Sequence, residues 1–213
     1  MNVLSLQCER EPTNGPIDVA RCWLDEFGRV TLATVVSTWG SSPVPVGGQL
    51  VVAPGERFDG SVSGGCVEVD VISEAADVMV TGHSKLLEFG VADETAWRSG
   101  LPCGGKMKVF LERLEGISDV AYLDAILAAR RSRTTLAVVT NLSTGVRRIF
   151  DTASAIPAEL AEGMVSGESR LIELEEGEIL LHVLTPPCAS SLPGPPRSGR
   201  SCQISRSGSV MTS

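Results

Sequence analysis

Aromatic side chains, histidines and long apolar runs are all scarce in this chain of 213 residues. Aromatic residues make up 4% of the sequence, so a core built from its 43% hydrophobic residues must be mainly aliphatic. No run of about 18 apolar residues is present, so we expect no membrane-spanning helix. The N-terminus lacks the basic start and apolar stretch of a signal peptide, which predicts a cytoplasmic protein.

A basic surface is also missing. The formal net charge is -8, and an acidic surface repels a phosphate backbone, so we expect no nucleic-acid partner. The two histidines and the absence of a Cys-x-x-Cys pair argue against a structural zinc site. In the expected reducing compartment the six cysteines are predicted to be thiols. They are Cys8, Cys22, Cys66, Cys103, Cys188 and Cys202.

Apolar periodicity indicates strands and helices that alternate without a fixed repeat. Helical patterns cover residues 16–26, 67–82, 120–131 and 157–164. Strand patterns cover residues 30–37, 49–53, 85–89, 106–112, 136–141, 147–150 and 178–184, with a hairpin between the 136–141 and 147–150 segments. We therefore predict an α/β fold, a single domain with one mixed sheet and flanking helices.

The composition changes after Thr185. Residues 1–185 hold 15 basic and 26 acidic residues, whereas residues 186–213 hold five prolines, eight serines, three arginines and no acid. This predicts a domain at 1–185 and a disordered tail at 186–213. One permitted set of codons from Cys188 onward, read displaced by two nucleotides, encodes the opening of a dinucleotide-binding βαβ unit. We therefore predict a frameshift that replaced a second domain, which sequencing of this gene region would test.

Glycine-rich loops around serine and cysteine carry the candidate chemistry. Ser41 and Ser42 follow a strand in Thr-Trp-Gly-Ser-Ser-Pro, a loop suited to a polar or anionic ligand but also an ordinary turn. Gly64 and Gly65 precede Cys66 where a helix begins, and a helix N-terminus favours the reactive thiolate. A small buried cysteine at a tight turn is the alternative.

A second cysteine, Cys103, has the same kind of flank, with Gly104 and Gly105 after it. The repetition favours function for both cysteines over packing. Glu68 is placed to cap the helix or to accept a hydrogen bond. Trp39 has two comparable interpretations, stacking on a planar ligand or packing at a rim. His83 and His182 are interpreted as structural or surface residues, and the acidic run from Glu173 to Glu178 as a solvated turn.

The three loops, in this order and spacing, resemble the XdhC/CoxI family over roughly residues 29–114. The matching segments are A-T-V-V-S-T-W-G-S-S-P, S-V-S-G-G-C-V-E and G-L-P-C-G-G. The resemblance implies a maturation factor for xanthine-dehydrogenase-type molybdenum hydroxylases, a cofactor-binding chaperone rather than a catalyst. It also implies a Rossmann domain after a Pro-Pro linker, in whose place this chain has the tail. Many relatives carry a basic residue after Ser-Ser-Pro, where this chain has Val44, which weakens phosphate binding by this loop.

The molybdenum cofactor, molybdopterin with its metal, is the ligand that the resemblance implies, bound transiently during sulfuration and insertion. Cys66 and Cys103 would contact molybdenum or carry sulfur as a persulfide, because soft sulfur ligands suit such a metal. Backbone N–H groups at Gly64, Gly65, Gly104 and Gly105 would reach an oxo group or the pterin phosphate, with Ser41 and Ser42 in the same pocket. The implied partners are the molybdenum hydroxylase apoenzyme, a cysteine desulfurase and a second copy of the chain. The alternatives are a redox-active or nucleotide-dependent oxidoreductase fragment, or a truncated, non-functional remnant.

Overall fold

The computed structural model describes residues 15–40, 42–90, 105–151, 154, 156–174 and 177–186. Four helices and nine strands lie within these ranges. In chain order the elements are α2 (Pro16–Phe27), β1 (Arg29–Trp39), β2 (Gln49–Ala53), β3 (Arg57–Gly60), α3 (Glu68–Thr81), β4 (Lys85–Phe89), β5 (Lys106–Glu115), α4 (Gly116–Ser132), β6 (Leu136–Asn141), β7 (Arg147–Asp151), α5 (Ala158–Ser166), β8 (Arg170–Leu174) and β9 (Gly177–Leu184).

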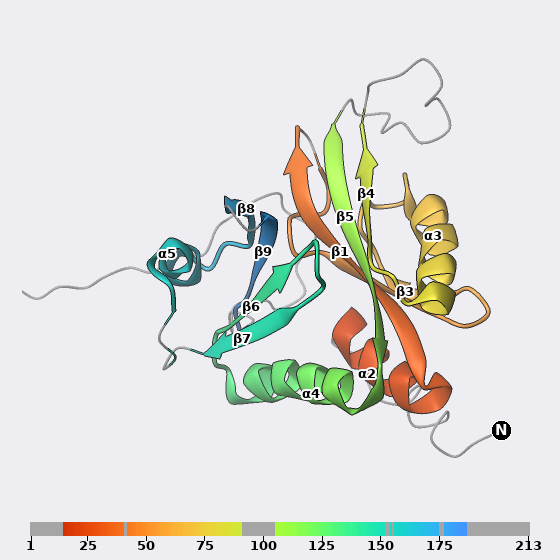
Figure 1. The fold of residues 1–213 in the computed structure, drawn as a ribbon, viewed down its shortest axis with the longest axis horizontal. Coiled ribbons are helices and arrows are strands. Elements are labelled where there is room, and N and C mark those ends of the chain that lie inside the picture. The colour runs from red at the N-terminus through yellow and green to blue at the C-terminus, as the bar shows by residue number, and fades with distance from the viewer. Residues whose placement is uncertain are drawn as a thin grey trace, which may run out of the picture.

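The strands form two sheets (Figure 1). One has five strands in the order β3-β2-β1-β5-β4, and the other has four in the order β7-β6-β9-β8. Every strand pair is antiparallel. The predicted α/β class is confirmed, and the predicted β6–β7 hairpin forms, but the expected single mixed sheet is wrong. Apolar periodicity reports which face of a strand is buried and carries no information about its partner or direction.

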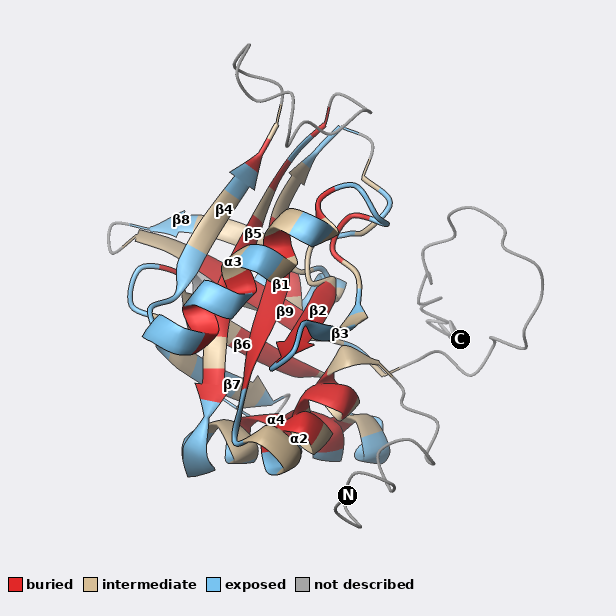
Figure 2. Ribbon diagram, turned by 90° about the vertical axis from the view of Figure 1, so that its right-hand side faces the viewer, coloured by how far each residue is buried: buried red, intermediate tan, exposed pale blue. Residues whose placement is uncertain are grey.

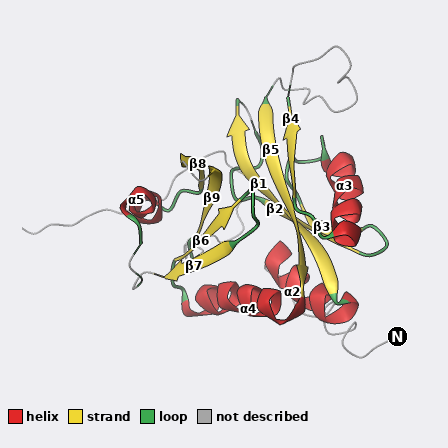
Figure 3. Ribbon diagram, in the orientation of Figure 1, coloured by secondary structure: helices red, strands yellow, loops and turns green. Residues whose placement is uncertain are grey.

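Aliphatic side chains fill separate layers on the two faces of the five-stranded sheet. Helix α3 packs its buried face, with Val71, Ala75 and Val78, on one side of that sheet. Helices α2 and α4 pack together against the lower part of β1, β2 and β5 and also reach β6 (Figures 1 and 3). A small cluster with Val36 and Phe110 lies between the two sheets. Buried residues run along β1 and β2 and on α2, so β1 is the centre of the core (Figure 2).

Two strands lack a clear sequence pattern because they lie at sheet edges. β3, with the sequence RFDG, is mostly exposed and shows no apolar alternation. β8 begins after Gly167 and contains Glu173, which the sequence assigns to a solvated turn. Glu173 on β8 lies opposite Glu178 on β9, so these two residues of the acidic run belong to paired strands and not to the expected turn. Of the predicted tail at residues 186–213, all but residue 186 lie outside the described residues.

Two further expectations concern single residues. Cys22, predicted to be a thiol, is disulfide-bonded, so that prediction is wrong for this residue. His182, assigned to the structural or surface class, is a buried strand residue on β9, and burial followed by the nearby charge of Arg130 lowers its pKa to about 4. No helix among the described residues is long and apolar enough to cross a membrane.

A buried ionic cluster joins the two sheets through α4. The Arg147 guanidinium on β7 lies 3.5 Å from a carboxylate oxygen of Glu112 on β5 and pairs with Asp119 on α4. The same guanidinium lies over the ring of Tyr122, 4.2 Å from its centroid. Arg147 on β7 therefore contacts both β5 and α4, and so links the four-stranded sheet to the five-stranded sheet.

Candidate functional site

The three glycine-rich loops are linked at one end of the five-stranded sheet. β1 and β5 pair so that Trp39 lies opposite Lys106, which sets the end of the first loop's strand beside the exit of the third loop. A Cβ added at Gly40 would lie 3.4 Å from the Cα of Gly105. On the other side of the first loop, a Cβ at Gly64 would lie 3.3 Å from Cγ of Pro43. Gly40 thus lies beside Gly105, and Pro43 lies beside Gly64 of the second loop.

The Glu68 carboxylate organises the loop that carries Cys66. Its Oε1 accepts hydrogen bonds from one hydroxyl and three consecutive backbone N–H groups. The donors are Ser61 Oγ at 2.6 Å, Val62 N at 3.2 Å, Ser63 N at 2.8 Å and Gly64 N at 3.0 Å. Gly64 has φ of 82°, a backbone conformation that favours glycine and turns its N–H toward the carboxylate. The loop therefore forms an anion-binding nest of backbone N–H groups, which is occupied by the Glu68 carboxylate at the start of α3.

The second oxygen of Glu68 extends this network to Cys66. Oε2 accepts from Gly65 N at 2.8 Å and from the Ser63 hydroxyl. The same Ser63 oxygen accepts from Cys66 N at 2.9 Å and from Val67 N at 3.1 Å. A chain of hydrogen bonds thus runs from the carboxylate through one serine to the backbone of the cysteine.

Opposing effects act on the Glu68 carboxyl group. Burial raises its pKa, but the hydrogen bonds from Ser61, Ser63 and the backbone outweigh this and lower it to about 2. The expected hydrogen-bond acceptor role of Glu68 is confirmed. Because Gly64 and Gly65 donate their N–H groups to Glu68, these groups are not free for an oxo group or a phosphate as the sequence suggested.

Cys66 is a free thiol and is exposed. The alternative of a small buried cysteine at a tight turn is therefore wrong. One residue, Val67, separates it from the start of α3 at Glu68, and its side chain makes no hydrogen bond with another described residue. The arrangement can present one sulfur to an external soft electrophile or metal from a backbone held in place by Ser63 and Glu68.

The other predicted site residues are divided between described and undescribed parts of the chain. Ser41, Cys103 and Gly104 lie outside the described residues. Ser42 donates its hydroxyl to the carbonyl of Val44 at 2.8 Å, so it stabilises its own loop. Val44 is partly buried against the core under α3, which explains an apolar residue at this position. No cluster of three or more metal-ligating side chains occurs within the described ranges.

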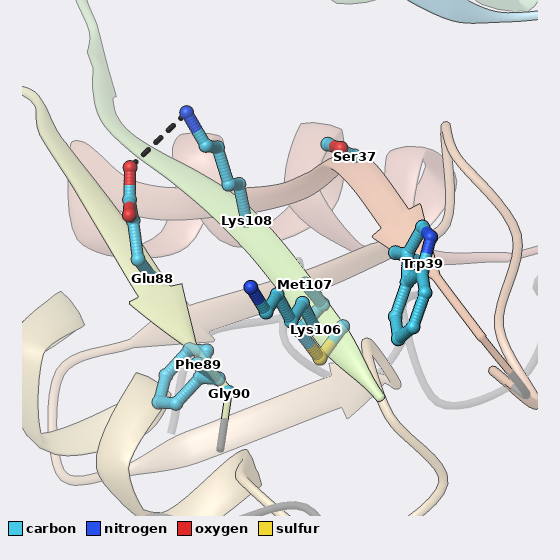
Figure 4. Close-up of a pocket in the computed structure, with 8 residues that line it drawn as sticks. All are labelled: Ser37, Trp39, Glu88, Phe89, Gly90, Lys106, Met107 and Lys108. Atoms are coloured by element: carbon cyan, nitrogen blue, oxygen red, sulfur yellow. Dashed lines mark ion pairs between the residues drawn. The ribbon is translucent and has the colours of Figure 1, made fainter. Parts of the chain in front are cut away.

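A cavity that the sequence did not reveal opens beside these loops. It has a volume of about 510 Å³ and is lined by Ser37, Trp39, Glu88, Phe89, Gly90, Lys106, Met107 and Lys108 (Figure 4). These residues come from three strand ends, and only the β1–β5–β4 register brings them together. The alternating K-M-K of residues 106–108 was visible in the sequence, but its partner strand was not.

Part of the chain is similar in sequence to known proteins. The model of the XdhC and CoxI family matches residues 23–90. The molybdenum cofactor insertion chaperone PaoD of Escherichia coli (strain K12) is 37% identical over 84 residues, which cover 39% of this chain and 26% of PaoD. A probable xanthine dehydrogenase subunit of Bacillus subtilis (strain 168) is 30% identical over 93 residues, which cover 43% of this chain and 28% of that protein.

A solved structure shares the fold. The crystal structure of a xanthine dehydrogenase from Bacillus halodurans superposes with a TM-score of 0.58 at 20% identity, over 81% of this chain and 53% of that one. The matches to the two curated relatives span only about a quarter of their length. The matched segment carries β1, the Ser-Ser-Pro loop and the hydrogen-bonded loop of Cys66. Residues 23–90 therefore match the XdhC and CoxI family, in line with the resemblance that the sequence motifs indicate.

Proposed function

We propose that this chain assists the maturation of xanthine-dehydrogenase-type molybdenum hydroxylases by binding the molybdenum cofactor as cargo. The observation that carries the proposal is the exposed free thiol of Cys66, which lies within the family segment on a loop held by Glu68. The similarity to a protein named as a molybdenum cofactor insertion chaperone supports it. In this role the chain supplies a protected site and catalyses no reaction itself.

The donor set of the described residues fits a transient contact better than a resident metal site. One exposed sulfur is available, and thiolate suits a soft metal centre. No group of three or more His, Cys, Asp or Glu side chains that could hold a metal ion occurs among the described residues. A single ligand holds a metal weakly enough to be passed on, which is what insertion into another protein requires. Cys103 is the proposed second sulfur, and its loop ends at Gly105 beside Gly40.

The finer steps follow from the same proposal. Cys66 and Cys103 would contact the molybdenum or hold sulfur for the sulfuration of the cofactor. A cysteine desulfurase would supply that sulfur, and the apoenzyme of the hydroxylase would receive the cofactor in the cytoplasm. A second copy of the chain is a further proposed partner.

The test is cofactor retention. We expect the chain, purified from cells that make the molybdenum cofactor, to carry molybdenum and pterin. Cys66→Ser should lower both because an alcohol is a poor ligand for a soft metal, and Cys103→Ser should also lower them. Bound metal is measured by mass spectrometry, and the pterin by the fluorescence of its oxidised form.

Val80→Ser is the matched control. Val80 is 74% exposed at the far end of α3, so the substitution adds a hydroxyl to the same helix without touching the loop. This variant should retain the cofactor like the unchanged chain. Equal retention by Cys66→Ser, Cys103→Ser and Val80→Ser would reject the proposal.

A further inference from the structure

The cavity at the ends of β1, β4 and β5 has the size and lining of a small-molecule site. Its volume of about 510 Å³ falls within the range of about 300–1,000 Å³ that is usual for ligand pockets. Apolar side chains, Trp39, Phe89 and Met107, alternate with cationic and hydroxyl groups around it (Figure 4). A site of this composition suits a ligand with a flat ring and a charged group.

A bulge in β1 brings the aromatic side chain to this cavity. The register between β1 and β5 shifts between Val35 and Ser37, and beyond it Ser37 lies opposite Lys108 and Trp39 opposite Lys106. Residues directly opposite in an antiparallel pair share a face, so the bulge sets Ser37 and Trp39 beside the two lysines. Trp39 is 68% exposed, which leaves its ring available for stacking and favours that interpretation over packing at a rim.

The two lysines in the cavity differ in their ion pairs with the described residues. Lys108 lies 3.1 Å from Glu88 and 2.9 Å from Glu178, so two carboxylates already balance its charge. Lys106 makes no ion pair with any described residue, and its stem lies over Gly90, where a Cβ would meet its Cγ at 2.9 Å. In a chain with a net charge of -8, an unpaired lysine beside an exposed tryptophan is a local site for an anion.

We propose that this cavity binds a flat heteroaromatic ring that carries a phosphate group. The Trp39 indole stacks on the ring, the Lys106 ammonium pairs with the phosphate, and the Ser37 hydroxyl offers a hydrogen bond to the ring edge. The inference rests on the proposed function, because the molybdenum cofactor is one source of this chemistry, a pterin phosphate. A purine mononucleotide is the other source.

The cavity and Cys66 lie on two sides of the same loop. Trp39 precedes Gly40, which approaches Gly105, while Pro43 at the other end approaches Gly64 near the cysteine. A ligand held at its ring and phosphate by the cavity would therefore have its remaining end near the 40–43 loop. The N–H groups of Gly64 and Gly65 already donate to Glu68, so we assign phosphate binding to Lys106 and not to these glycines.

The experiment measures binding of defined probes to the full chain by isothermal titration calorimetry. The two source probes are 6-hydroxymethylpterin monophosphate and guanosine 5′-monophosphate. Guanosine tests the ring without phosphate, and inorganic phosphate tests the anion without a ring. We expect at least one ring phosphate to bind more tightly than guanosine and inorganic phosphate, and the tighter of the two identifies the source.

Variants of Trp39 and Lys106 test the ring contact and the phosphate contact separately. Trp39→Ala should weaken binding of the ring phosphate at least about fivefold, as for other base-stacking aromatics. Lys106→Gln should weaken it about tenfold while leaving guanosine unaffected. Lys85→Gln is the control, because Lys85 lies at the opposite end of β4 and pairs with Glu74 outside the cavity.

Equal affinity for all four probes, or binding unchanged by both Trp39→Ala and Lys106→Gln, would overturn the inference. Failure of the proposed function is distinguishable from this result. If Cys66→Ser abolishes cofactor retention while the cavity variants change nothing, the function stands and the cavity assignment falls. If a ring phosphate binds as expected but the chain carries no molybdenum, the reverse holds.

Discussion

Glu68, partly buried at the start of α3, and Glu112, buried where β5 meets Arg147 of the other sheet, have carboxyl pKa values shifted in opposite directions. Burial raises the pKa of both carboxyl groups. At Glu68, two hydroxyls and four backbone N–H groups reverse the effect and bring the pKa to about 2. At Glu112, burial dominates the attraction of Arg147, and with Asp119 nearby the pKa rises to about 7.

The difference shows that donors close in sequence stabilise a buried charge better here than one distant guanidinium. All donors to Glu68 come from residues 61–65, on the same loop. Glu112 depends on Arg147, whose Nη1 has no hydrogen-bond partner among the described residues and lies 3.5 Å from it. The Cys66 loop is therefore expected to keep its shape through local contacts, whereas the contact of Glu112 with Arg147 depends on the two sheets staying together.

Removing Arg147, the cation shared by Glu112 and Asp119 between the two sheets, should have the largest effect on stability. Arg147→Ala leaves the buried carboxyl group of Glu112 and the partly buried one of Asp119 without their partner, which we expect to cost about 4 kcal/mol in the free energy of unfolding at pH 7. The loss should shrink at pH 5, where the Glu112 carboxyl group, whose pKa is raised to about 7, holds a proton. Urea denaturation at the two pH values measures it.

Arg148→Ala is the matched control, since Arg148 is the exposed neighbour on β7. Its cost should stay below about 1 kcal/mol. Equal costs for both variants would mean that the ionic cluster does not hold the sheets together.

The second-largest effect is expected from the raised pKa of Glu112, which should appear in the pH dependence of stability. Its carboxyl group keeps a proton in the folded state up to about pH 7, whereas the unfolded group loses it near pH 4.5. The folded state therefore binds more protons in this window, and stability falls as pH rises from about 4.5 to about 7. Glu112→Gln should remove a decline of up to about 3 kcal/mol.

The measurement compares slopes of unfolding free energy against pH for the two proteins. His182, with its pKa lowered to about 4, contributes an opposite slope between about pH 4 and 6.5 in both, so the difference between them isolates Glu112. Identical slopes would contradict the raised pKa.

The smallest of the three effects is expected at Glu68. Its depressed pKa contributes stability above about pH 4.5 that is lost as pH falls toward about 2. Glu68→Gln replaces one acceptor oxygen by an NH₂ group facing N–H donors, so we expect a loss of about 2 kcal/mol at pH 7 that vanishes near pH 2.

Glu74→Gln on the same helix is the control, because Glu74 makes only an exposed ion pair with Lys85 and should cost less than about 1 kcal/mol. The alkylation rate of the Cys66 thiol gives a second readout for Glu68→Gln. We expect that rate to change with the loop, and an unchanged rate together with full stability would remove Glu68 from its positioning role.

Part of this protein could be predicted from its sequence. Apolar periodicity with helix-ending glycines placed α2 and α3 to within a residue or two, and β2 and β4 at their observed limits. The glycine flanks of Cys66 and the position of Glu68 were sufficient to select the hydrogen-bonded loop, because all its contacts lie within eight residues. The division at residue 185 remains a prediction.

The tertiary structure alone decided the rest, because it depends on pairing between distant segments. No pattern in residues 29–39 or 106–115 reports that β1 pairs with β5, that a bulge falls after Val35, or that Trp39 meets Lys106. The same holds for Arg147 and Glu112, which join different sheets. Local hydrogen bonds and periodicity can be read along the chain, whereas partners, register and cavities arise only when separate strands bury their faces against one another.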